Sequence, residues 1–177
     1  MEVAEFTLFG ITFKLLSEVN LEMVRIWRNS DDVRLFMQYQ EIITPEQQQT
    51  WFDKINNKYN YYFVVYDGNE PFGLFNIKDI DYINKIGETG SFLRNRSYWG
   101  SDLAGRASLG LGYFAFETIK LDSLFCHILK DNNPVIKFNK HQGFVIDEQF
   151  SSYNVVKMIC NKDDFNTKTF KFLKYFV

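Results

Sequence analysis

The chain has 177 residues, with 20 basic against 22 acidic side chains and a formal net charge of −2. This length suits a single domain over residues 1–177, and the near-neutral charge argues against a protein that coats nucleic-acid phosphates. Because 46% of the residues are hydrophobic and 18% aromatic, disorder is excluded, and no apolar run reaches the roughly 18 residues of a membrane span.

The N-terminus and the cysteines indicate a cytoplasmic protein. No basic segment followed by an apolar stretch opens the chain, so no signal peptide is predicted. Cys126 and Cys160 each lie in an apolar, strand-like run, are too few for a disulfide framework and match no zinc spacing. We therefore expect reduced, buried thiols and no bound metal.

The first predicted elements are a strand or hairpin and two helices. Apolar residues alternate in places over 6–15, which indicates a strand or a hairpin around Gly10. Apolar residues at helical spacing then predict one helix at 21–29 and a second, short one at 31–39.

A third helix has a clear start signal. Thr44 can cap it, Pro45 suits its first position, and Gln47 can complete a capping box. The helix is expected to run to about Asn56.

Three strands are predicted next. Residues 61–66 are aromatic and β-branched, and the turn at 67–69 joins them to a strand at 72–80. A third strand region follows at 82–83 and 87–93.

The second half alternates between helices and strands. The expected elements are a long helix at 103–119, a strand at 124–129, a short helix at 134–141, and strands at 144–150 and 153–160. The tail from Phe165 to Val177 carries too many aromatics to leave exposed, so it is expected to form an additional strand or to dock on a partner chain. The whole order predicts an α/β fold, a mixed sheet with helices on both faces.

Two segments carry residues suited to chemistry. In the first, from Glu88 to Ala107, a strand ends, a loop with Gly100 follows and a helix starts, which directs backbone N–H groups at an anion such as a phosphate. In the second, from Asn132 to Phe144, an asparagine at a strand end precedes a short amphipathic helix and Gly-Phe. Alone, an ordinary strand-to-helix turn and a capped helix also explain them.

Together the two segments resemble the GNAT superfamily of acetyl-CoA-dependent N-acetyltransferases. Tyr98-Trp99-Gly100 is similar to the Tyr-Trp-Gly-Lys-Gly-x-Ala form of that family's pyrophosphate loop, and residues 132–144 to its Asn-x-x-Ala/Ser…Gly-Phe segment. The resemblance covers about Leu15 to Cys160. It implies a GNAT-like, mostly antiparallel twisted sheet with a splayed pair of parallel strands.

The N-terminal half narrows the resemblance. Trp27-Arg28-Asn29-Ser30, Val33, Phe36-Met37 and the stretch at 43–51 look like the bacterial branch that acetylates amino groups on nucleotide-linked deoxy-sugars, with the pseudaminic-acid pathway enzymes as the best match. Acetyltransferases of ribosomal proteins share a similar Arg-Asn opening. The resemblance implies direct attack of an amine on the thioester of acetyl-CoA, in the biosynthesis of a cell-surface polysaccharide.

The same resemblance assigns the binding residues. Those implied for the cofactor are Gly90, Ser91, Phe92, Leu93, Ser101, Leu103, Ala104, Gly105, Arg106, Asn132 and Phe138. Those implied for the acceptor are Arg28, Asn29, Phe36, Met37 and Tyr39, where an aromatic wall suits a base or sugar face and Arg28 a phosphate. Plain packing is the alternative for the wall, and Trp27, Trp51 and Trp99 are expected in the core.

Asp102 departs from the family pattern, which has a small residue at this position. A carboxylate aimed at a pyrophosphate would repel it, whereas an outward one would favour the helix N-terminus. Arg96 and Arg106 are candidate counter-charges.

The catalytic candidates are His127, Glu88 and Asn139. The imidazole of His127 suits taking a proton from an amine, and Glu88 could act through a water molecule, although a structural role fits both. Asn139 stands where many family members carry a tyrosine as the acid, but an amide cannot transfer a proton at neutral pH. Solvent, Tyr98 or Tyr153 would then protonate the thiolate.

Two other functions fit the sequence. One is acetylation of a protein N-terminus or a small amine, although a cationic acceptor needs an acidic cleft and no acidic cluster is evidently aimed at the site. The other is a degenerate, non-catalytic acyl-CoA-binding module, motivated by Asp102 and Asn139. The partners expected are a small-molecule substrate, no nucleic acid, no membrane, and a second copy of the chain docked through the tail.

Overall fold

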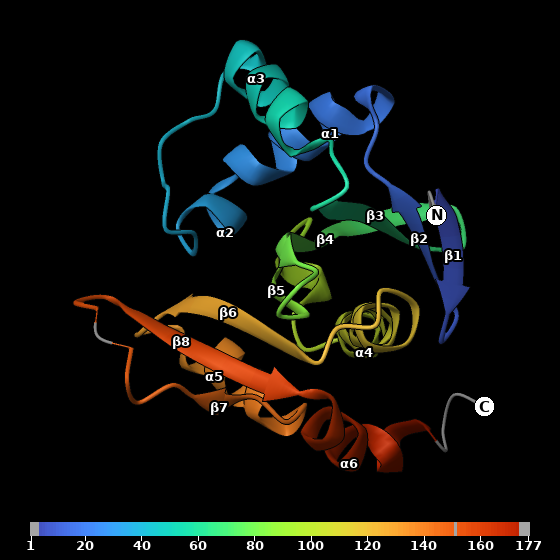
Figure 1. Ribbon diagram of the computed structural model, residues 1–177. Coiled ribbons are helices and arrows are strands. Elements are labelled where there is room, and N and C mark those ends of the chain that lie inside the picture. Colours follow the sequence, from blue (N-terminus) through green and yellow to red (C-terminus); the bar gives the residue numbers. More distant parts are fainter. Residues whose placement is uncertain (1–3, 151, 174–177) are drawn as a thin grey trace.

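The computed structural model describes residues 4–150 and 152–173, which form an eight-stranded sheet with helices on both faces (Figure 1). Its elements are β1 (Glu5–Leu8), β2 (Ile11–Leu15), α1 (Glu18–Asn29), α2 (Asp31–Arg34), α3 (Pro45–Ile55), β3 (Tyr61–Asp67), β4 (Glu70–Asp81), β5 (Ile86–Leu93), the 3₁₀ helix η1 (Arg96–Tyr98), α4 (Asp102–Tyr113), the π-helical segment η2 (Phe114–Thr118), β6 (Ser123–Leu129), α5 (Asn133–His141), β7 (Val145–Ile146), β8 (Val155–Asn161) and α6 (Lys162–Leu173).

The strand order is β1-β2-β3-β4-β5-β6-β8-β7. Every neighbouring pair is antiparallel except β5 and β6, which run parallel. The chain reaches β6 from β5 by crossing over through α4, because parallel neighbours need a long connection. This arrangement confirms the predicted mixed fold with one parallel strand pair.

The core has two layers, one on each face of the sheet. Side chains alternate along β3, so Tyr62 and Val64 pack with α1 and α3, whereas Phe63 and Val65 pack on the α4 side. Both faces of this strand are buried, which explains its nearly continuous apolar sequence. In Figure 1, α1, α2 and α3 lie on one side of the sheet and α4, α5 and α6 on the other.

The start of α3 is the one that the sequence predicts. The Thr44 hydroxyl accepts a hydrogen bond from the Gln47 backbone at 3.2 Å, and the Gln47 side chain accepts one from the Thr44 backbone at 2.9 Å. This capping box satisfies two N–H groups that the first helical turn leaves open.

The helix predicted at 31–39 is wrong beyond Arg34. Residues 35–43 form no helix or strand, and side chains bind their carbonyl groups. Arg28 donates to the Tyr39 carbonyl at 2.7 Å, and Arg34 donates to the Gln40 carbonyl at 2.9 Å. These bonds replace the helical ones that the apolar spacing predicts.

Two strand predictions are also too long. Residues 82–83 lie in a turn, because the Asp81 carboxylate accepts hydrogen bonds from the backbone of Ile83 and Asn84 at 2.9 Å each. The strand predicted at 144–150 shrinks to β7, whose two residues pair with β8.

The tail forms helix α6 and not an additional strand. Asn161 caps it, accepting a hydrogen bond from the Asp164 backbone at 2.8 Å and donating one to the Asp164 carboxylate at 2.8 Å. Phe165 then packs so closely on Gly112 of α4 that a Cβ at Gly112 would lie only 2.4 Å from its ring. Residues 174–177 lie outside the described part, and docking of the tail on another chain stays a prediction.

Two further observations concern the cysteines and the lengths of the helices. Cys126 and Cys160 are buried free thiols, and burial raises the pKa of each to about 12. No helix within these residues combines the length and apolar character needed to cross a membrane.

Candidate active site

The parallel strands β5 and β6 separate part-way along their length. They pair at Ile86 with Ser123, Gly87 with Leu124 and Glu88 with Phe125, and no pairing follows, although β5 continues to Leu93 and β6 to Leu129. The β5 edge beyond Glu88 therefore carries backbone groups without a strand partner on that side. Gly90, Ser91, Phe92 and Leu93, the predicted cofactor residues, all lie on this stretch.

The N-terminus of α4 follows β5 after the loop 94–101. Ser101 is the N-cap residue, but its hydroxyl donates to the Tyr98 carbonyl at 2.7 Å and does not cap the helix. The first backbone N–H groups of a helix have no partner within it, so those of Leu103 and Ala104 can bind an anion. A Cβ at Gly105 would meet no atom within 4 Å, so there is open space beside this turn. We call β5 from 89 to 93, together with the loop 94–101 and this helix turn, the donor side, because it holds most of the residues that the sequence assigns to the cofactor.

The side chain of Asp102 is 72% exposed, and its carboxylate lies 3.1 Å from Nε of Arg106, one turn further along α4. Arg106 also donates to the Phe9 carbonyl at 3.2 Å, so its guanidinium is held near the β1–β2 turn. Arg96 binds Asp32 at 2.7 Å and is no counter-charge to Asp102. Of the two alternatives for Asp102, the structure therefore favours the outward one.

The helix α5 places the second family segment. Asn132 precedes it and its side chain makes no capping bond, while Phe138 is exposed on the helix. Asn139 is half-buried and donates a weak hydrogen bond to the sulfur of Cys126 at 3.8 Å. The positions of Asn132 and Phe138 do not test their predicted roles in cofactor binding, which stay predictions.

His127 and Glu88 meet where the strands separate. The Nδ1 atom of His127 lies 3.0 Å from Oε1 of Glu88, with the side chains 23% and 16% exposed. The rings of Phe125 and Phe150 lie 5.6 and 5.2 Å from the imidazole. The two sequence candidates for the base therefore form one hydrogen-bonded pair.

The acceptor side, which we define as α1, α2 and residues 35–43, holds the predicted wall. Phe36 is 38% exposed and meets the edge of Trp99 at 5.1 Å, and Trp99 is itself 46% exposed. Placing Trp99 in the core was therefore wrong, because it packs outward on Phe36 and under Arg96. Trp27 is buried as predicted.

Asn29 is occupied within the chain. Its side chain donates to the Ile43 carbonyl at 2.8 Å and accepts from the Ile43 backbone N–H at 2.9 Å. The residue thus fixes the end of the 35–43 segment, a role that the sequence did not indicate. Met37 is half-buried and Tyr39 is exposed on the same segment.

Arg28 and Arg34 each retain a buried nitrogen without a hydrogen-bond partner among the described residues: Nη1 of Arg28 and Nε of Arg34. Burial, together with the charge of Arg34, lowers the pKa of the Arg28 guanidinium. Arg34 is paired with Asp31 at 2.6 Å, whereas Arg28 has no carboxylate partner among the ion pairs of the described residues.

A hollow of about 480 Å³ opens between α3 and strands β3 and β4. Its walls include the aromatic rings of Trp51, Tyr59 and Tyr62 and the amino group of Lys78. Lys78 also lies 3.0 Å from Glu88, so the hollow adjoins the His127–Glu88 pair. No local sequence pattern indicates Lys78, because only the register of β4 on β5 brings it next to Glu88.

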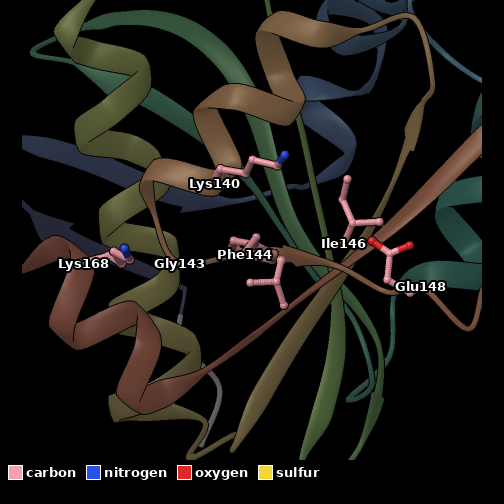
Figure 2. A pocket seen from close by; sticks show the side chains of 7 residues that line it. Lys140, Gly143, Phe144, Ile146, Glu148 and Lys168 are labelled. Atoms are coloured by element: carbon pink, nitrogen blue, oxygen red, sulfur yellow. The ribbon is translucent and has the colours of Figure 1, made fainter.

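A second hollow has a volume of about 380 Å³ and is lined by residues at the end of α5, in and next to β7, and in α6 (Figure 2). Lys140, Phe144 and Lys168 are among its residues, and none of the site residues predicted from the sequence lines it. No group of three or more His, Cys, Asp or Glu side chains that could hold a metal occurs in residues 4–150 and 152–173.

The model of the acetyltransferase (GNAT) domain family matches residues 11–145. The chain belongs to this family. Two relatives from Campylobacter jejuni, each named acetyltransferase PseH, are 26% identical over 152 residues and 25% identical over 148. The first match covers 82% of this chain and 92% of the relative, and the second 81% and 88%. The GNAT resemblance drawn from the sequence is thereby confirmed, and the chain is an N-acetyltransferase.

Two solved structures show the same fold. FdhC, a nucleotide-linked sugar GNAT, is 17% identical with a TM-score of 0.80, and the match covers 98% of both chains. Spermidine N-acetyltransferase from Vibrio cholerae, in complex with CoA and spermine, is 18% identical with a TM-score of 0.74, over 88% of this chain and 98% of that one. GNAT acetyltransferases use acetyl-CoA as the acetyl donor.

Proposed function

We propose that this N-acetyltransferase transfers the acetyl group of acetyl-CoA to the amino group of a nucleotide-linked amino-deoxy sugar. The observation that carries the proposal is Arg28 on the acceptor side, which donates to the Tyr39 carbonyl at 2.7 Å and has no carboxylate partner among the ion pairs of the described residues. A phosphate of the acceptor would supply the negative charge that this guanidinium lacks.

The charges beside the acceptor side disfavour a polyamine. Asp31 is paired with Arg34 at 2.6 Å and Asp32 with Arg96 at 2.7 Å, so neither is free to bind a cation. Lys54 and Lys78 line the adjoining hollow, in which Asp79 is the single carboxylate among the described lining residues. Cationic acceptors such as spermidine meet like charges there, which costs binding energy. The relatives named PseH and the likeness to FdhC agree with a sugar acceptor.

The donor side fits acetyl-CoA. The free backbone edge of β5 would bind the pantetheine arm, and the N–H groups of Leu103, Ala104 and Gly105 the pyrophosphate. Acetyl-CoA, once bound, supplies the acetyl group as an activated thioester. Asn132 would donate to the end of the pantetheine arm.

The chemistry is assigned to the pair at the strand separation. His127 takes a proton from the acceptor amine, and Glu88 holds its imidazole in place. The neutral amine would then attack the thioester carbonyl, whose oxygen backbone N–H groups of β5 could stabilise. The C–S bond would break to release the thiolate, and the proton left on the nitrogen would pass to solvent. Asn139 would donate a hydrogen bond to the thiolate, which would take its proton from solvent.

The proposal is tested by following thiol release with a nucleotide-linked 4-amino sugar, with spermidine and with an N-terminal peptide. We expect turnover with the sugar and little with the other two. In Arg28→Met, KM for the sugar should rise roughly ten- to a hundred-fold because a charged hydrogen bond is lost. Arg28→Lys should retain part of the affinity. Turnover of spermidine above that of the sugar would refute the proposal.

A further inference from the structure

Lys78 completes a row of three polar side chains that crosses strands β4, β5 and β6. Its amino group lies 3.0 Å from Oε2 of Glu88, and Oε1 of Glu88 lies 3.0 Å from Nδ1 of His127. Lys78 and Glu88 are direct register partners, so both side chains project from the same face of the sheet. The carboxylate is thus bound on both oxygens, one to each neighbour.

The backbone next to Lys78 is shaped by a β-bulge. The register between β4 and β5 shifts between Lys78 and Asp81, and Asp79 between them has a φ of 51°, in the left-handed region. Asn60 holds this conformation by accepting a hydrogen bond from the Asp79 backbone at 3.0 Å. Bulges redirect side chains at functional sites, and here the bulge immediately follows the residue that binds Glu88.

Lys78 also forms an ion pair with a second carboxylate, that of Asp79, but this pair is the weaker one. Asp79 lies 3.6 Å from its amino group and is 71% exposed, whereas Glu88 is closer and 16% exposed. Water screens an exposed pair more than a buried one, so the bond to Glu88 governs where the amino group rests.

The protonation pattern of His127 follows from this row. An ionised carboxylate only accepts hydrogen bonds, so the bond between Glu88 and Nδ1 requires the proton on Nδ1. Nε2 then carries the lone pair that can accept a proton from an amine. From the other neighbouring strand, Lys157 faces His127 in register but is paired with Asp147 at 3.3 Å.

We propose that Lys78 is a positioning residue. By holding Oε2, it keeps the Glu88 carboxylate from rotating, so that His127 stays in the Nδ1–H form and presents Nε2 to the acceptor. The catalytic part of this inference rests on the proposed role of His127 as the base. The tautomer itself does not depend on that role.

The tautomer is measured by ¹⁵N NMR of the imidazole nitrogens at a pH where both rings are neutral. The chain has two histidines, so His141, an exposed residue at the end of α5, serves as an internal reference. Lys78→Met removes the charge and keeps most of the side-chain length. We expect His127 to be mainly Nδ1–H in the wild type and a mixture of both forms in Lys78→Met, with His141 unchanged.

Two control variants test whether the change in the His127 tautomer is specific to Lys78 or follows the loss of any lysine–carboxylate pair. Lys78→Arg keeps the charge and should restore the wild-type tautomer. Lys85→Met removes a more exposed lysine–carboxylate pair, Lys85 with Asp122 at 3.5 Å, immediately before β5, and should leave His127 unchanged. An unchanged tautomer in Lys78→Met, with circular dichroism showing a folded protein, would overturn the proposal.

Kinetics provide the second readout. In Lys78→Met, kcat for the nucleotide-linked sugar should fall roughly ten- to a hundred-fold, because a misplaced catalytic group loses rate steeply. The Kd for acetyl-CoA should stay unchanged, and Lys78→Arg should recover most of kcat. Wild-type protein that acetylates no sugar would count against the proposed function alone, and the NMR measurement, which needs no acceptor, would then decide on Lys78.

Discussion

The donor side and the acceptor side of the candidate site are held in place by different kinds of bond. On the donor side, the groups suited to binding are backbone groups, positioned by the separation of β5 from β6 and by the start of α4. On the acceptor side, residues 35–43 form no regular element, and Arg28, Asn29 and Arg34 fix their backbone. A backbone site tolerates unusual side chains such as Asp102, whereas a segment held by side chains depends on each of them.

The largest expected effect is on turnover and not on substrate binding at either side. In His127→Ala, turnover should fall roughly 10²- to 10⁴-fold because the general base is lost. The Kd for acetyl-CoA, measured by calorimetry, should not change, since the donor groups are backbone. His141→Ala is the matched control and should behave as the wild type. Normal turnover in His127→Ala would remove this residue from the mechanism.

The next effect breaks the acceptor side alone. Asn29→Ala deletes both hydrogen bonds to Ile43, which should lower the free energy of unfolding by about 1–3 kcal/mol and raise the acceptor KM. Urea unfolding and initial rates measure the two quantities. Gln49→Ala, which removes a hydrogen bond to Asp53 on the exposed surface of α3, is the control. An equal loss of affinity for acetyl-CoA would contradict the division into two sides.

A smaller effect tests the donor side. Asp102→Asn removes a solvent-exposed negative charge that stabilises the N-terminus of α4. The Kd for acetyl-CoA should therefore stay the same or rise by less than about five-fold. Calorimetry measures the affinity. Tighter binding by ten-fold or more would mean that the carboxylate faces the pyrophosphate.

The smallest effect concerns the acid. If solvent protonates the thiolate, Asn139→Ala should change kcat by no more than about three-fold, because an amide transfers no proton. Stopped-flow detection of the free thiol would measure it. A much larger fall would assign Asn139 a direct part in the reaction.

The same division explains what the sequence could predict. The signal of the donor side is local, because the glycine-containing loop before α4 needs only neighbouring residues. The capping box at Thr44, which starts α3, is equally local. The His127–Glu88 pair was foreseen as two separate candidates, and its contact followed from strand register. Lys78 was missed because its partner is ten residues away and reached only across paired strands.

The errors have equally physical causes. Apolar spacing continues past Arg34, but arginine side chains compete for the carbonyl groups of 35–43, and such competition leaves no periodic signal. In the tail, alternating aromatics suggested a strand, although Asn161 followed three residues later by Asp164 is a helix-start pattern. Phe165 and Thr169, four residues apart, are both buried in that helix.

The two sides nevertheless touch at one place. Phe36 meets Trp99, and Asp32 binds Arg96, so the acceptor wall rests on the loop that precedes α4. If bound acetyl-CoA orders this loop, it also changes the affinity of the acceptor side for the acceptor. Thermodynamic linkage then requires the bound acceptor to change the affinity for acetyl-CoA by the same factor. Because the indole of Trp99 is exposed at this contact, ligand binding at either side should change its fluorescence, so the coupling can be measured without a label and without the reaction taking place.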